Sequence, residues 1–252
     1  MNKFERVRFQ FLNQFKSGIT PVDSRKPIAD ELAKQMVSEL IDMGVDKDSK
    51  VGVIDAFMIL STHLKEAGFT NLTLIEQDHQ ELEDNQVKYY NMIQGICKNS
   101  DIVYSTDTTD MKFDVIIGNP PYQNGKNKST TNSLWKEFLK KSVEMSDVVY
   151  LVLPDIALAP PTFSIYKNKI AQVNLDVKKH FRGVGSGFCS LLITNDNNDT
   201  TDIITKDNVI TIERGSLNCV PLAFDNDLLD DMNYFLKGNR EWKLTYEYES
   251  RK

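Results

Sequence analysis

The sequence predicts an α/β fold, in which a mostly parallel sheet carries helices on both faces and has an antiparallel hairpin at its edge. Two observations lead to this fold class. Short, almost continuous apolar runs such as "FDVIIG" (residues 113–118) are typical of strands that are buried on both faces of a parallel sheet. These runs alternate with segments whose apolar residues recur at helical spacing, as expected for repeated strand and helix units.

The first clear element is an amphipathic helix over residues 23–44, with Ser24 as its start signal, Pro27 in its first turn and Gly44 as its stop. Strands and helices then alternate down to residue 154. We predict strands at 50–57, 71–78, 101–106, 113–119 and 147–154, and helices at 59–68, 79–96 and 132–145.

The last hundred residues are less regular. A helix is predicted at 162–172, and segments 174–181 and 187–194 are predicted to pair as the edge hairpin. A polar loop follows at 195–202, and a helix at 225–238. We therefore predict three regions: an N-terminal extension (1–23), a main domain (24–194) and a small C-terminal subdomain (195–252).

Composition excludes several classes of protein. The 252 residues carry a net charge of -6 and have a pI near 5.2, which argues against a protein that coats nucleic acid through charge alone. The apolar runs are too short to cross a bilayer and the N-terminus lacks the apolar core of a signal peptide, so we expect a cytoplasmic protein with no membrane partner. Three widely spaced cysteines favour reduced thiols, and no metal site is expected.

Two groups of basic residues offer a local exception to the acidic charge. Taken alone, either group is explained by a solvated loop. If the protein binds nucleic acid on one of its faces, however, basic residues of this kind would have to contact the phosphates, and the binding would depend strongly on salt. The groups are Lys126 with Lys128, and Lys178, Lys179 and His180 with Arg182.

The most informative segment is "NPPY", residues 119–122, which directly follows the apolar run 113–118. Parallel α/β sheets bind ligands at the carboxyl ends of their strands. Pro120 and Pro121 fix their own φ and restrict the residue before each, so the backbone around Asn119 is stiff. The Asn119 side-chain oxygen and the nearby carbonyls are acceptors suited to an exocyclic amino group, and Tyr122 offers a flat face for a nucleobase. A rigid turn without other function would use the same residue types.

The segment "FDVIIGNPPYQ" resembles the catalytic strand and loop of the S-adenosylmethionine-dependent amino-methyltransferases, including the adenine-N6 DNA methyltransferases of restriction-modification systems. The resemblance implies a Rossmann-like class I methyltransferase sheet, S-adenosylmethionine as cofactor and DNA as partner. It also implies that the target adenine leaves the duplex and stacks on Tyr122, while the Asn119 side chain and the Pro120 carbonyl accept its amino N–H bonds. Such acceptors favour a pyramidal nitrogen and so stabilise the transition state more than the ground state.

Further residues follow from the same resemblance. "KPIADELAKQMVSEL" is similar to the helix that precedes the cofactor strand in the gamma arrangement of the family, which places Pro27 near the cofactor. Asp55 and Phe57 match the acid and its neighbour at the end of that strand, Glu76 the acid that holds the ribose hydroxyls, and Asp107 stands near the acid that contacts the cofactor's adenine. Both Glu76 and Asp107 are also ordinary residues for a strand end.

Substrate contacts are expected from both sides of the motif. Lys126, Lys128 and Arg182 are candidates for DNA contacts, and Phe188 for a second stacking surface, although a core phenylalanine would fit its surroundings as well. The resemblance covers residues 24–194, and the region after it is short for a target-recognition domain. A protein partner could then supply target recognition.

The cofactor loop departs from the family. In "VIDAFMILSTH" the residues from Met58 to Ser61 replace the glycines that let the backbone pass close to the cofactor's methionine portion, and β-branched Ile59 suits a positive-φ turn poorly. Three functions therefore remain open at this point. They are methylation of adenine in DNA, the same chemistry on RNA or on a protein glutamine, and binding or regulation without turnover.

Overall fold

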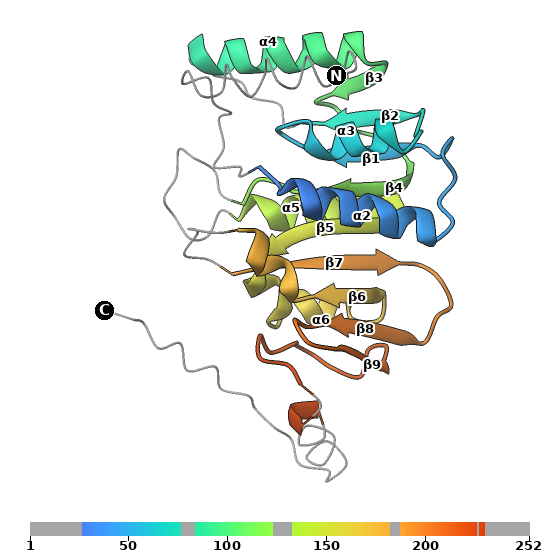
Figure 1. The fold of residues 1–252 in the computed structure, drawn as a ribbon, viewed down its shortest axis with the longest axis vertical. Helices are drawn as coiled ribbons and strands as arrows, with labels where there is room; N and C mark the ends of the chain where they lie inside the picture. The colour runs from blue at the N-terminus through green and yellow to red at the C-terminus, as the bar shows by residue number, and fades with distance from the viewer. Residues whose placement is uncertain (1–26, 77–83, 123–132, 182–186, 226, 230–252) are drawn as a thin grey trace.

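The computed structural model describes residues 27–76, 84–122, 133–181, 187–225 and 227–229, and a nine-stranded sheet forms its centre (Figure 1). The order of the strands across this sheet is β3-β2-β1-β4-β5-β7-β6-β8-β9. The predicted fold class is confirmed. The strands are β1 (Val51–Ile54), β2 (Leu72–Ile75), β3 (Ile102–Ser105), β4 (Phe113–Gly118), β5 (Ser146–Pro154), β6 (Ile170–Asn174), β7 (Phe188–Thr194), β8 (Thr200–Ile204) and β9 (Val209–Glu213).

The direction of winding reverses at β1. Strands β2 and β3 lie on one side of it and β4 and β5 on the other, with every neighbouring pair from β3 to β5 parallel. Strand β7 then enters antiparallel between β5 and β6. Open α/β sheets bind ligands beyond the carboxyl ends of their strands at such a reversal point, so the ends of β1 and β4 are the expected place for a site.

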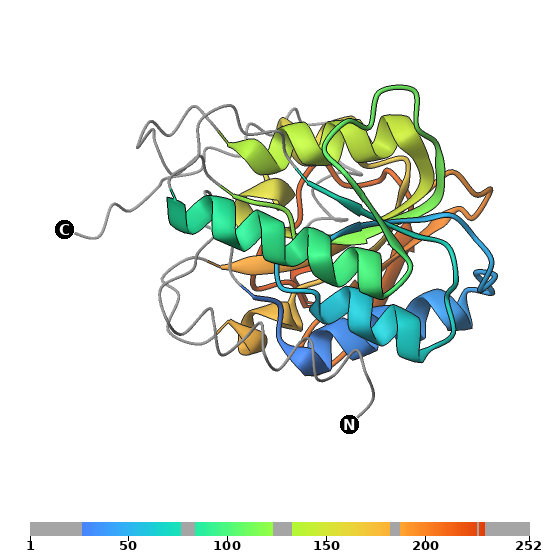
Figure 2. The same ribbon diagram turned by 90° about the horizontal axis from the view of Figure 1, so that it is seen from above.

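Helices cover both faces of the sheet. Figure 2 shows α2 (Asp30–Asp42) and α3 (Ile59–Glu66) on one side and α5 (Leu134–Met145) on the other. The first core includes α2, α3 and α4 (Asp84–Asn99), and the second includes α5 and α6 (Thr162–Tyr166). Pro27 is exposed and α2 begins three residues later, at Asp30, so Pro27 does not lie in the first turn as predicted.

The edge of the sheet differs from the prediction. Residues 162–172 were expected to form a helix, but α6 ends at Tyr166 and Ile170–Asn174 form β6, which pairs with β7. Residues 174–181 were expected to form a strand, but the Asn174 side-chain oxygen accepts the Asp176 N–H at 2.9 Å and the chain turns into the 3-10 helix η2 (Asp176–His180). The antiparallel hairpin at the edge is β8–β9 instead, so the sheet continues past residue 194.

The connection between β3 and β4 is short. Residues 106–112 join the two strands without a helix, whereas each of the other parallel connections in the described structure contains one: α3 joins β1 to β2, α4 joins β2 to β3 and α5 joins β4 to β5. A helix at this connection would lie on the same face as α5. The face of β1 and β2 beside α5 is therefore covered by a loop, and this leaves room for a cavity.

None of the helices within the described residues is both long and apolar enough to cross a membrane.

Candidate active site

The predicted catalytic motif starts where β4 ends, directly against β1. The Asn119 N–H donates to the Ile54 carbonyl at 2.8 Å, and Gly118 pairs with Ile54 in the sheet. A Cβ atom at Gly118 would lie 2.5 Å from the Ile54 Cβ and 2.7 Å from its carbonyl oxygen. Only glycine permits this approach, and it anchors the motif at the point where the winding of the sheet reverses.

The motif itself is packed and stiff. Asn119, Pro120 and Pro121 are buried, and Tyr122 is half-buried. The Tyr122 hydroxyl donates a hydrogen bond to the Asn119 side-chain oxygen, the acceptor that the family resemblance assigns to the target amino group. Burial raises the pKa of Tyr122 above its usual value, so the phenol stays protonated and remains a donor.

Tyr122 is the first of three aromatic rings that pack in a row, followed by Phe188 and Phe181. The Tyr122 and Phe188 rings lie 5.1 Å apart at 44°, and the Phe188 and Phe181 rings stack at 4.3 Å and 28°. Phe188 begins β7, the antiparallel neighbour of β5, so the topology brings together residues 66 positions apart (188 minus 122). The structure thus places Phe188 beside the motif, and Phe181 is an addition that the sequence did not indicate.

The cofactor loop has closed into a tight turn. Asp55, Ala56, Phe57 and Met58 are all buried, and helix α3 starts directly after Met58, which adopts the left-handed conformation at φ 57°. The Asp55 carboxylate accepts the Ser61 N–H at 2.8 Å and the Ser61 hydroxyl at 3.0 Å, so it caps the first turn of α3. Burial raises the pKa of Asp55, and these donors offset only part of that rise.

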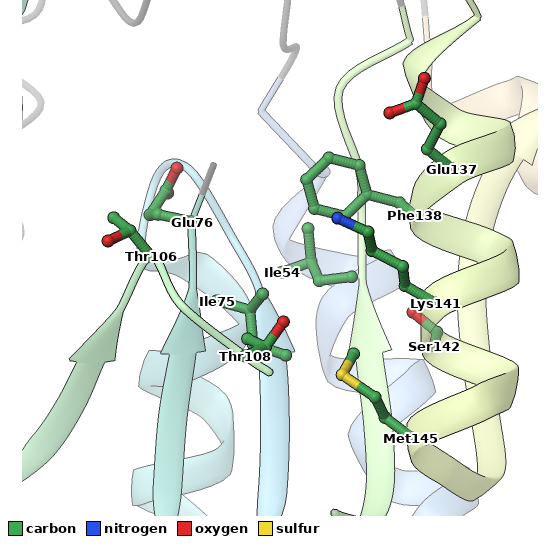
Figure 3. A pocket seen from close by; sticks show the side chains of 10 residues that line it. All are labelled: Ile54, Ile75, Glu76, Thr106, Thr108, Glu137, Phe138, Lys141, Ser142 and Met145. Carbon is green, nitrogen blue, oxygen red and sulfur yellow. The ribbon is translucent and has the colours of Figure 1, made fainter. Parts of the chain in front are cut away.

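A cavity of about 260 Å³ lies between the strand ends and α5 (Figure 3). Glu76, which is buried at the end of β2, lines it together with Ile54 and Ile75. The connection 106–112 forms part of the wall, and α5 closes the opposite side (Figure 3). Lining residues that the sequence did not indicate are Thr106, Thr108, Glu137, Phe138, Lys141, Ser142 and Met145.

Other predicted residues lie apart from this cavity. Asp107 is exposed, and its carboxylate accepts the Thr109 N–H at 2.9 Å; hydrogen bonds from Thr109 lower its pKa. Its neighbours Thr106 and Thr108 line the cavity, and Asp107 is absent from its walls. Pro27 is likewise exposed outside it.

The predicted DNA-contacting cations Lys126, Lys128 and Arg182 lie outside the described residues. Of the neighbouring basic group, Lys178 and Lys179 are exposed beside Phe181, and Lys179 is paired with Asp176. Within the part of the chain that the structure describes, no cluster of His, Cys, Asp and Glu could hold a metal ion.

The two halves of S-adenosylmethionine would meet different surroundings here. The cavity offers the adenosine half a buried acid, Glu76, several apolar side chains and the buried Ser142 hydroxyl, which has no hydrogen-bond partner within the described part of the chain. The described residues therefore fit an adenosine. For the methionine half, the Asp55 carboxylate already accepts hydrogen bonds from Ser61, and Phe57 and Met58 are buried in the hydrophobic core, so the turn in the described conformation offers this portion no free acid.

Comparison with known proteins supports the family. Residues 42–157, which run from the end of α2 through β5 into the 3-10 turn after it, match the family described as Eco57I restriction-modification methylase. No curated protein sequence matches the chain.

Comparison with solved structures found several similar chains. One described as a modification subunit of a type I restriction enzyme from Vibrio vulnificus superposes with a TM-score of 0.50 and 11% identity, over 96% of this chain and 60% of that one. A Thermoplasma acidophilum protein superposes with a TM-score of 0.46 and 14% sequence identity, over 79% of this chain and 100% of that one. A Pyrococcus horikoshii protein described as an RNA methyltransferase superposes with a TM-score of 0.41 and 17% sequence identity, over 64% of this chain and 82% of that one.

Proposed function

Because residues 42–157 of this chain match the family described as Eco57I restriction-modification methylase, we propose that the protein transfers a methyl group from S-adenosylmethionine to the exocyclic amino group of adenine in DNA. One observation carries the choice of an amino group as target. The Asn119 oxygen, an uncharged acceptor, is held at the reversal point of the sheet beside Tyr122, whose hydroxyl donates to it and whose ring is aromatic. A planar aromatic amine matches both features.

Each residue of the motif has a role in this proposal. Tyr122 stacks on the extruded base, and the Phe188 ring packs against the Tyr122 ring at 5.1 Å and holds it in place. The Asn119 oxygen and the Pro120 carbonyl accept the two amino N–H bonds, which favours the pyramidal nitrogen of the transition state. Pro121 keeps these groups rigid, so little reorganisation accompanies the reaction.

The cofactor supplies an electrophilic methyl group when it is bound. Glu76 is suited to hold the ribose hydroxyls, because its carboxylate is buried at the end of β2 and lines the cavity. Asp55 acts indirectly in this scheme, since its carboxylate caps α3 and fixes the turn between β1 and that helix. Phe57 is part of the same buried turn.

DNA is the proposed macromolecular partner. The Vibrio vulnificus protein with the same fold is described as one subunit of a restriction enzyme. By analogy, we propose that a protein partner supplies target recognition to this chain as well. Lys126, Lys128 and Arg182 remain candidates for phosphate contacts.

The experiment is a transfer assay with isotope-labelled S-adenosylmethionine and three acceptors: duplex DNA, structured RNA and a protein with exposed glutamines. Nucleosides and peptides are then analysed by mass spectrometry. The proposal expects N6-methyladenine in DNA. Label found only in RNA or protein would contradict the choice of substrate, and label in none of the three would contradict turnover.

A binding or regulatory module without turnover is the second candidate, and the closed turn favours it. Asp55 is used by α3, and Met58 occupies the left-handed position where the family resemblance expects glycine. Such a module would keep a base-binding face at Tyr122 and would not transfer methyl groups. It is distinguished from the enzyme by retained nucleic-acid or protein binding in a preparation that gives no labelled product.

The hydrogen bond within the motif leads to a test of substrate binding. The Tyr122 hydroxyl occupies the Asn119 oxygen and has to leave it before a target amino group can bind. We expect Tyr122→Phe, which keeps the ring, to raise kcat/KM for DNA by about 2–10-fold, the equivalent of one competing hydrogen bond.

The control for this variant is Tyr122→Ala, which removes the stacking face as well. Loss of base stacking of about 1–3 kcal/mol predicts roughly a 5- to 150-fold decrease in kcat/KM. Steady-state kinetics on a single DNA substrate measure both variants. If Tyr122→Phe were as slow as Tyr122→Ala, the hydroxyl would be required for catalysis and would not compete with the substrate.

A further inference from the structure

Ser142 is a polar residue on the buried side of α5. It is 1% exposed, and its hydroxyl has no hydrogen-bond partner among the residues that the structure describes. The residue lines the cavity, and Figure 3 shows its oxygen turned from α5 toward the strands. Buried hydroxyls are almost always paired, because an unpaired one loses its bonds to water without replacement. A ligand group that reaches Ser142 would restore the missing hydrogen bond.

Two of the polar residues that line the cavity, Glu76 and Ser142, lie on opposite sides of it. Glu76 lies at the end of β2 and Ser142 on α5, with the apolar side chains of Ile54 and Ile75 between them (Figure 3). In a purine nucleoside the sugar and the six-position substituent are likewise at opposite ends of a flat, largely apolar ring system. A nucleoside whose ribose lies at Glu76 would therefore direct the far edge of its base toward Ser142.

Lys141 is an exposed residue in the wall of the same cavity. Its side chain is exposed and extends from α5 over the space between the helix and the strands (Figure 3). No hydrogen bond or ion pair joins it to another described residue, so it can move aside at little cost when a ligand enters.

We propose that the Ser142 hydroxyl accepts a hydrogen bond from the exocyclic amino group of an adenine nucleoside, and that Ser142 determines the specificity of this cavity for adenine. The inference rests on the proposed function, because it takes the cavity as the site of the cofactor's adenosine. It concerns binding alone, so it is tested without methyl transfer.

The test is calorimetric titration of the full chain and of Ser142→Ala with adenosine and with purine riboside, which lacks the amino group. Ser142→Ala should weaken adenosine binding by about 2–10-fold, as expected for one hydrogen bond, and leave purine riboside binding unchanged. Without ligand, the same variant should melt no lower than the unaltered protein, because it removes a buried group that is unpaired.

Ser146→Ala is the matched control. The Ser146 hydroxyl is also buried, but it donates to the Val148 carbonyl at 2.8 Å and lies outside the cavity. This variant should lower Tm and keep the affinity for adenosine. Equal adenosine affinity in Ser142→Ala and the unaltered protein, equal losses for both nucleosides, or no adenosine binding at all would overturn the inference. Normal adenosine binding without methyl transfer would contradict only the proposed function.

Discussion

Replacing Asn119 with alanine is expected to lower kcat/KM for methyl transfer to DNA by at least about 100-fold, the range found when one preorganised transition-state hydrogen bond is removed. The side-chain oxygen would be lost, whereas the backbone N–H that donates to the Ile54 carbonyl at 2.8 Å would remain. The loop should therefore keep its place on β1. Single-turnover transfer rates and circular dichroism measure the two effects separately.

Asn174→Ala provides the control for that loss. Asn174 is also buried and accepts a backbone N–H, from Asp176 at 2.9 Å, but it lies at the end of β6 and not in the motif. We expect this variant to lose some stability and to retain methyl transfer after correction for the folded fraction. A similar loss of rate in both variants, or an Asn119→Ala protein with an unchanged rate, would remove Asn119 from the catalytic scheme.

Gly118→Ala is expected to have the largest effect on stability. The added methyl group would lie 2.5 Å from the Ile54 Cβ and 2.7 Å from the Ile54 carbonyl oxygen, and backbone atoms cannot turn away as a flexible side chain could. Separating β4 from β1 at this point should lower the free energy of unfolding by about 1–3 kcal/mol or more. It should also displace Asn119 and reduce transfer.

The same substitution at Gly95 is the matched control. Gly95 lies inside α4, and a Cβ atom there would have no neighbour within 4 Å. Gly95→Ala should raise the free energy of unfolding by about 0.5–1 kcal/mol, because alanine favours the helix. Urea denaturation of the two variants checks the pair. A Gly118→Ala protein as stable as Gly95→Ala would mean that the close contact between β4 and β1 is absent.

Much of the main domain could be predicted because its signals are local. The apolar runs of β1, β2, β4 and β5 lie where the sequence placed strands, and the amphipathic pattern gave α2, α3 and α5. The position of the motif at the end of β4 followed from adjacency along the chain. The topological rule for ligand sites then placed it at the carboxyl edge of the sheet.

The errors arose where tertiary contacts decide the outcome. Ile170–Asn174 form a strand because they pair with both β7 and β8. The helix predicted at 162–172 rested on apolar spacing along the chain, and that spacing carries no information about these pairings. Likewise, the order of the strands places β8 and β9 on the same sheet, although the polar run before them suggested a new region.

The cavity was harder still to predict, because its walls come from strands, a loop and a helix that are distant in sequence. One signal was available: Ser142 follows Phe138 by four positions, so a polar residue stands on the apolar face of the predicted helix. Asp107 was chosen by analogy with an acid after the third strand. The side chains that reach the cavity there are those of Thr106 and Thr108.

The glycine-poor turn after β1 presents the sharpest question about this protein. The cavity beside Glu76 and the Asn119 motif both adjoin Ile54, the last residue before that turn, and the proposed methyl transfer requires a cofactor that reaches both. Calorimetric titration of the full chain with S-adenosylmethionine tests this most directly. We predict binding with a Kd in the micromolar range, about -8 kcal/mol at 1 μM, which requires the turn from Asp55 to Met58 to open. Adenosine binding of normal strength with no detectable binding of S-adenosylmethionine would contradict the proposed enzyme.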